Sequence, residues 1–261
     1  WPWVGWVVVC LCIFGFIWSI YLNGWAFEPL EYNPLVGPSV GALVAAGAKD
    51  TPKIMYDGEW WRLVTQLFLH GGLVHMAMNM FTLVRHGFPL ERHAGTQRFA
   101  PIYIGAGILA SLFSAVFLPD IISVGASGSV FGILGSIWGD FLANYSQLLQ
   151  VDGGWKFCLC TLMALSITTL INLVLGLLPF VDNFAHVGGF IGGVLIGLAV
   201  MVRPRKSGIS TATRATQCCA LSTYFLLVLM GCISLLARWD VAGWCPLCRA
   251  VSCLPTPYWD C

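Results

Sequence analysis

Seven long apolar stretches constrain this chain more than any other feature of its sequence. A helix that crosses the hydrocarbon core of a bilayer needs about 20 mostly apolar residues. The stretches that meet this length run over residues 3–22, 73–90, 99–118, 127–145, 155–178, 183–202 and 216–237. The sequence therefore predicts an all-α polytopic membrane protein, with a transmembrane domain over residues 1–238 and a cysteine-rich tail over residues 239–261.

The composition supports this class. Hydrophobic residues make up 58% of the chain and charged residues 10%, whereas ordinary soluble domains are about 25% charged. A net charge of +1 provides no basic surface for nucleic acid. The first stretch has the position of a signal peptide, but it is long and lacks a convincing cleavage site, so we count it as a span. Since the chain opens with Trp1 rather than Met, we expect a polar segment to precede it.

The distribution of basic residues predicts the orientation. The loop after the sixth span carries Arg203, Arg205, Lys206 and Arg214 and no acid, which predicts a cytosolic loop. Counting back places the acid-rich loop over residues 23–69 on the luminal or outer side, and counting forward places the tail there too.

The eleven cysteines fall into two groups. Seven lie within apolar runs, where we expect small side chains packed in helices: Cys10, Cys12, Cys158, Cys160, Cys218, Cys219 and Cys232. The other four lie in the tail: Cys245, Cys248, Cys253 and Cys261. Cys245 and Cys248 form a CxxC motif that alone is compatible with metal binding or redox chemistry. In a luminal tail we expect one or two structural disulfides among these four.

Two polar residues stand out because polar groups within spans are costly. Ser127 begins the fourth span and His186 lies in the first turn of the sixth. Both spans run from lumen to cytosol in the predicted topology, so both residues lie at similar, shallow depth. We interpret them as a nucleophile and its general base.

Glycines at four-residue spacing predict that these two spans touch. The fourth span carries Gly128 and Gly132, and the sixth carries Gly189 and Gly193. Small residues at this spacing let two helix backbones approach closely in lipid. Such an approach would bring a serine hydroxyl within hydrogen-bonding distance of a histidine.

The residues around the pair favour a dyad over a triad. Asp140 lies about 20 Å along the helix from Ser127, and Asp182 or Asn183 is better suited to cap the sixth span. His75 and Asn79 share one face of the second span and are candidate oxyanion donors, although a polar pair that joins helices is the alternative. His70, His86 and His93 are expected to be structural or solvated, and we expect no metal site and no cofactor.

This pattern resembles the rhomboid family of intramembrane serine proteases. The resemblance covers nearly the whole chain, and it rests on four motifs in this order: Trp61-Arg62, His75-Met-Ala-Met-Asn79, Gly125-Ala-Ser127-Gly128 and Ala185-His186-Val-Gly-Gly189. A seventh span after a six-helix core looks like the secretase-type subgroup. The segment over residues 33–39 and the tail over residues 252–261 look like plant members.

The resemblance implies roles for individual residues. Ser127 would be the nucleophile and His186 its base, with His75 and Asn79 joining the backbone N–H of Ser127 in an oxyanion hole beside Gly125. Trp61, Arg62 and Glu91 would be structural supports. Arg85 and His86 depart from the family pattern, which questions how the second span packs.

The implied activity is cleavage of membrane-anchored substrates within the bilayer, in or near their transmembrane segments, without a cofactor. A Golgi or plasma-membrane location with the active site facing the lumen or exterior suits such a protein. One alternative is a catalytically silent relative that binds transmembrane clients for trafficking or degradation. A transporter or channel is another, but the polar groups within the spans cluster near one face.

Overall fold

A computed structural model describes residues 1–175, 181–202, 210–245 and 248. Within these ranges the regular structure is helical, apart from one isolated antiparallel bridge between Lys49 and Ser123. The long helices are α1 (Trp3–Leu22), α7 (Thr96–Phe117), α8 (Ser127–Leu148), α9 (Gly154–Leu175), α10 (Asn183–Val200) and α11 (Thr211–Leu236). The predicted all-α class is confirmed.

The second predicted span is one continuous helical path in three parts. It comprises α5 (Leu73–Thr82), the π-helix η2 (Leu83–Gly87) and α6 (Phe88–Ala94). Arg85 and His86 lie exposed on the π-helical turn, while Gly87 faces the neighbouring helix, where a Cβ atom would lie 3.0 Å from Ile133 Cδ1. The two polar residues that depart from the family pattern therefore point away from the packed interior.

Five helices of the described residues are individually long and apolar enough to cross a membrane: α1, α7, α9, α10 and α11. A sixth candidate is the segment Arg62–Phe68 with Leu73–Ala94, which bends by 89° at the break between its two parts. Helix α8 is not in this group, although it occupies the place predicted for the fourth span. Its mean hydropathy is lowered by glycines, serines, Asp140 and Asn144, and apart from Asp140 most of these residues are buried in the protein.

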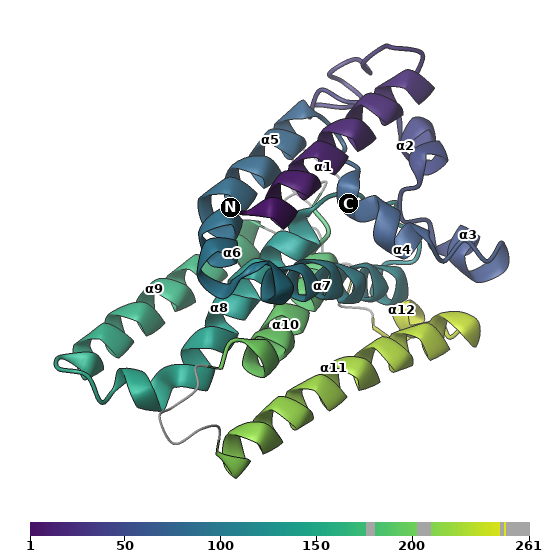
Figure 1. Cartoon of the computed structure of the whole chain (residues 1–261). Coiled ribbons are helices and arrows are strands. Elements are labelled where there is room, and N and C mark those ends of the chain that lie inside the picture. Colours follow the sequence, from purple (N-terminus) through teal and green to yellow (C-terminus); the bar gives the residue numbers. More distant parts are fainter. Residues whose placement is uncertain (176–180, 203–209, 246–247, 249–261) are drawn as a thin grey trace.

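Helix α8 lies in the middle of the bundle (Figure 1). It contacts α10 most extensively, and also α7, α9 and the α5–η2 segment. A central helix meets protein on most sides, so small and polar residues cost it little. The main hydrophobic core joins this centre to α1, α6, α7 and α11 through buried side chains such as Cys12, Phe88, Tyr103, Ile133 and Tyr224.

The loop between α1 and α5 contains short helices that the sequence did not predict. They are α2 (Val40–Ala46), α3 (Thr51–Tyr56), α4 (Arg62–Thr65) and the 3-10 helix η1 (Gln66–Phe68). Ser39 caps α2 and Asp50 caps α3, each accepting a backbone N–H with its side chain. Helices α2 and η1 contact α1, and α4 contacts α7. The Thr51 hydroxyl, at the start of α3, donates to the carbonyl of Ala115 near the end of α7.

Four of the seven cysteines that we expected to be packed are instead exposed. Cys12 and Cys158 are buried and Cys232 is partly buried, but Cys10, Cys160, Cys218 and Cys219 lie on outer helix faces. The expectation is wrong for these four because apolar runs predict a helix but do not say which face it buries.

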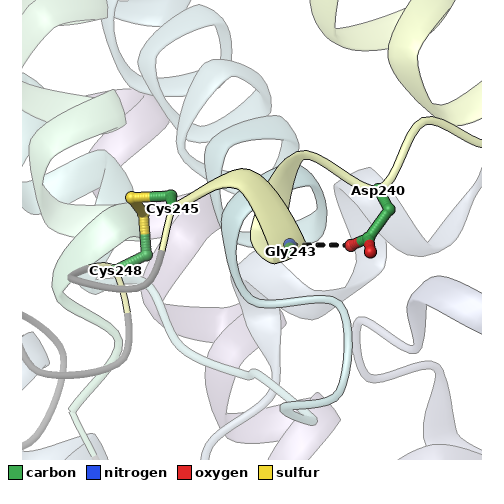
Figure 2. Close-up of a disulfide and its surroundings, with 4 residues drawn as sticks. All are labelled: Asp240, Gly243, Cys245 and Cys248. Carbon is green, nitrogen blue, oxygen red and sulfur yellow. Dashed lines mark hydrogen bonds between the residues drawn. A yellow bond between two sulfur atoms is a disulfide. The ribbon is translucent and has the colours of Figure 1, made fainter.

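The tail contains a disulfide, as expected. Cys245 and Cys248 are bonded directly after α12 (Val241–Trp244), and the Gly243 N–H donates to Asp240 Oδ1 over 2.8 Å (Figure 2). Cys253 and Cys261 lie outside the described residues, as do Arg203, Arg205 and Lys206 of the loop predicted to be cytosolic.

Candidate active site

Ser127 is the first residue of α8 and is partly buried. Gly125, two residues earlier, has φ +135°, a conformation that L side chains rarely adopt. A Cβ atom there would lie 2.8 Å from His75 Cε1, 3.0 Å from His75 Nε2 and 3.7 Å from Ser127 Oγ. Gly125 is therefore needed for both its backbone angle and its space, and His75 and Ser127 flank the same small region above it.

His186 lies one turn into α10 and is 7% exposed. Its ring stacks on Phe131 with centroids 4.0 Å apart and an angle of 13° between planes. Phe131 follows Ser127 by four residues, so both lie on one face of α8. The ring of His186 therefore covers the face of α8 that begins with Ser127.

Asp182 fixes the start of α10. Its Oδ1 accepts the Ala185 N–H over 2.9 Å, and its Oδ2 accepts the hydroxyl of Ser114 from α7. The carboxylate is thus used as a helix cap, as the sequence predicted. A negative charge at this end also complements the helix dipole.

Glycines bring the backbones of α8 and α10 into contact. A Cβ atom on Gly189 would lie 2.0 Å from the carbonyl oxygen of Gly128, and one on Gly193 would lie 2.0 Å from that of Gly132. On their other side, Gly128 and Gly132 face alanine side chains of α7. The glycines of α10 thus set the separation between the helix that carries Ser127 and the helix that carries His186.

The second span supplies polar groups beside the start of α8. Asn79 is buried, and one N–H of its side-chain amide donates to the His75 carbonyl over 3.0 Å. The amide has a second N–H. Ala126, the residue before α8, has no side-chain hydrogen bond that caps the helix. The first i to i−4 hydrogen bond of α8 joins the Val130 N–H to the carbonyl oxygen of Ala126. The backbone N–H groups of the first turn come before this first hydrogen bond, so they are available to an oxyanion.

The predicted supports hold the loop and the helices around the site. Arg62 is buried and donates to the carbonyls of Val44 and Ala48 over 2.8 and 2.9 Å, and its guanidinium lies 4.6 Å from the centre of the Trp61 ring. Glu91 is 1% exposed. Its carboxylate accepts the N–H groups of Val4 and Gly5 in the first turn of α1.

Two further residues lie near the site although the sequence did not assign them to it. His70, expected to be structural or solvated, is fully buried and makes an edge contact with the His75 ring at 5.3 Å. Phe131 had no distinguishing signal, because an aromatic residue in an apolar run is ordinary. Among the described residues, no group of three or more His, Cys, Asp or Glu side chains is arranged to hold a metal ion.

The fold and the site define an all-α membrane protein in which a serine and a histidine begin two tightly packed helices. A family model for the rhomboid domain matches residues 57–203. RHOMBOID-like protein 6, mitochondrial, from Arabidopsis thaliana is 34% identical over 256 residues, 92% of this chain and 81% of that protein. The Rhomboid protease GluP of Bacillus subtilis is 39% identical over 159 residues, 60% of this chain and 29% of that protein.

The chain therefore belongs to the rhomboid family, and it is an integral multi-pass membrane protein. The resemblance inferred from the four motifs is confirmed at the level of the family. Another relative, Inactive RHOMBOID-like protein 8 from Arabidopsis thaliana, is 31% identical over 264 residues, 92% of this chain and 72% of that protein. Family membership supports intramembrane protease activity in general, whereas activity of this chain has to be argued from its own site.

Proposed function

We propose that the chain is an intramembrane serine endopeptidase that cleaves membrane-anchored proteins in or near their transmembrane segments. The observation that carries the proposal is the stacking of His186 on Phe131, one turn below Ser127 on the same face of α8. This arrangement supports a Ser127–His186 dyad. The substrates are transmembrane proteins, and no cofactor is required.

In the proposed reaction, His186 takes the proton of the Ser127 hydroxyl as Oγ attacks the scissile carbonyl carbon. The backbone N–H of Ser127 and the side chains of His75 and Asn79 donate to the oxyanion that forms. Collapse breaks the C–N bond, and His186 gives its proton to the leaving amine. A water molecule then attacks the acyl-enzyme with His186 again as base, which releases the carboxylic acid and restores Ser127.

Water must reach this reaction although the enzyme is embedded in lipid. Ser127 is partly exposed and begins its helix at the luminal end in the predicted orientation, which supports access from that side. We propose that the active site faces the lumen or exterior, in the Golgi or plasma membrane.

The test is cleavage of a transmembrane reporter in proteoliposomes by the full chain. We expect Ser127→Ala and His186→Ala each to abolish cleavage. Ser129→Ala is the matched control, since Ser129 is a fully buried serine on α8 whose Oγ lies beside Gly107 of α7. Cleavage by Ser127→Ala at the wild-type rate would refute the mechanism.

The rival function is that of a silent relative that binds transmembrane clients. The relative at 31% identity is named as inactive, and this favours testing the alternative function as well. It predicts that the wild-type chain leaves the reporter uncut while Ser127→Ala retains client binding unchanged.

A further inference from the structure

The side chain of Lys49 is fully buried in this structure, which is unusual for a lysine. It follows α2 in the loop before α3 and is 0% exposed. Lysine is almost never fully buried unless its ammonium is paired or hydrogen bonded. Its Nζ donates to the carbonyl oxygen of Leu118, the C-cap residue of α7, over 2.9 Å.

The main chain of Lys49 holds the same segment a second time. Its N–H donates to the Ser123 carbonyl over 2.9 Å, and the Ser123 N–H donates back over 3.2 Å. The segment over residues 118–125 leads directly to Ser127. A further hydrogen bond joins the Gly125 N–H to the Gln66 carbonyl over 2.9 Å. Lys49 therefore makes the hydrogen bonds that hold Leu118 at the beginning and Ser123 in the middle of the segment that leads to Ser127.

The charge of Lys49 also acts on the helix that carries the histidine. Three carboxylates lie near enough to favour its charged form: Asp182, the cap of α10, then Asp50, the cap of α3, and Asp120 in the loop after α7. Asp182 has the largest effect of the three. One buried cation is thus hydrogen bonded to the segment before Ser127 and acts electrostatically on the cap of the helix that bears His186.

We propose that Lys49 is a positioning residue for catalysis, whose ammonium holds the Leu118 carbonyl so that Ser127 keeps its placement relative to His186. This role rests on the proposed protease function, because it concerns the geometry of that dyad. Lys49 itself touches neither substrate nor the reacting atoms.

A residue that only stabilises the fold would behave differently from a positioning residue. Burial penalises the charged form of Lys49, and its pKa is lowered to about 8. Replacement by methionine keeps the length of the side chain and removes that penalty, so the fold should not lose stability. The attachment to Leu118 and the charge near Asp182 are lost together, so the catalytic geometry should suffer.

The experiment compares Lys49→Met with the wild-type chain in proteoliposomes. We expect kcat for reporter cleavage to fall by about tenfold or more with KM unchanged, because misplacement of reacting groups acts on the chemical step. The melting temperature should be equal or higher. Hydrogen exchange of the backbone amides over residues 118–125 should become faster.

The pH profile supplies a signature that a structural role would not produce. In the wild-type chain kcat should fall between pH 7 and pH 9 as Lys49 loses its proton. The low kcat of Lys49→Met should stay level over the same range. Lys53→Met is the matched control, since Lys53 lies on α3 in the same region, is partly exposed and pairs with Asp57 at 3.7 Å. It should behave as the wild-type chain does.

Two results would overturn the proposal. One is a Lys49→Met chain with wild-type kcat and wild-type exchange over residues 118–125. The other is a parallel loss of stability and activity at every pH, which is the behaviour of a fold-stabilising residue. If the wild-type chain shows no Ser127-dependent cleavage, the proposed protease function is wrong. In that case hydrogen exchange alone tests Lys49, and unchanged exchange over residues 118–125 in Lys49→Met would reject the positioning role.

Discussion

Replacing Gly189 with alanine places a methyl group against the backbone of α8. The added Cβ would lie 2.0 Å from the carbonyl oxygen of Gly128, whereas nonbonded heavy atoms rest at about 3.5 Å. A backbone carbonyl in a helix cannot rotate away as a side chain can. The two helices must therefore separate by about 1 Å or more at this point.

Two losses follow from that separation. Overpacking of this kind costs typically about 2 kcal/mol of stability. Gly189 lies three residues after His186, and Gly128 lies next to Ser127, so the displacement falls on the proposed dyad. A misplacement of about 1 Å can lower a rate about 100-fold. We expect Gly189→Ala to lose both stability and cleavage, and the rate to fall by more than the unfolded fraction explains.

The assay measures reporter cleavage and thermal unfolding in the same proteoliposomes. Gly231→Ala is the control, because its added Cβ would lie 3.3 Å from Cβ of Leu112, close to ordinary van der Waals contact, and a shift of a few tenths of an ångström between the helices accommodates it. It should stay within about 0.5 kcal/mol of the wild-type chain. A Gly189→Ala chain with wild-type cleavage and melting would refute the close packing of α8 and α10.

Three further predictions follow from other contacts. Glu91→Gln should lower stability by about 2 kcal/mol, seen as a lower melting temperature, because the carboxylate accepts the Val4 and Gly5 N–H groups; unchanged melting would contradict this. Burial lowers the pKa of Lys49 from 10.5 to about 8. Between pH 8 and pH 10.5 the unfolded chain therefore binds more protons than the folded chain. The free energy of unfolding should rise by about 3 kcal/mol over this pH range. Lys49→Met should lack that rise in a series of unfolding measurements from pH 7 to 10.5. Cys245→Ser breaks a disulfide that closes a short loop beside α12, so reporter cleavage should keep its wild-type rate, and a loss of more than a few-fold would assign the tail a role at the site.

The sequence predicted the long helices well because their signals are local. Residues 3–22 form one apolar run and one helix, and the apolar stretch predicted over residues 127–145 begins at Ser127, as α8 does. The glycine spacing also indicated which two helices meet. Such patterns depend only on composition and periodicity, so they can be recognised without knowing which residues pack against each helix.

Other features depend on contacts between distant parts of the chain. The π-helical turn over Leu83–Gly87 places Gly87 against Ile133 of α8, and nothing near Gly87 in the sequence indicates that neighbour. The burial of Lys49 needs the end of α7, 69 residues later. The stacking of His186 on Phe131 likewise exists only once α8 and α10 pack together.

The central claim is that Ser127 is a nucleophile activated by His186. A fluorophosphonate probe tests it directly, because the probe forms a covalent bond with an activated serine hydroxyl and needs no knowledge of the natural substrate. Mass spectrometry of the labelled wild-type chain in membranes should find the phosphonate on Ser127, and His186→Ala should lose the label while remaining folded. Absence of label on Ser127, or equal labelling in His186→Ala, would contradict the claim.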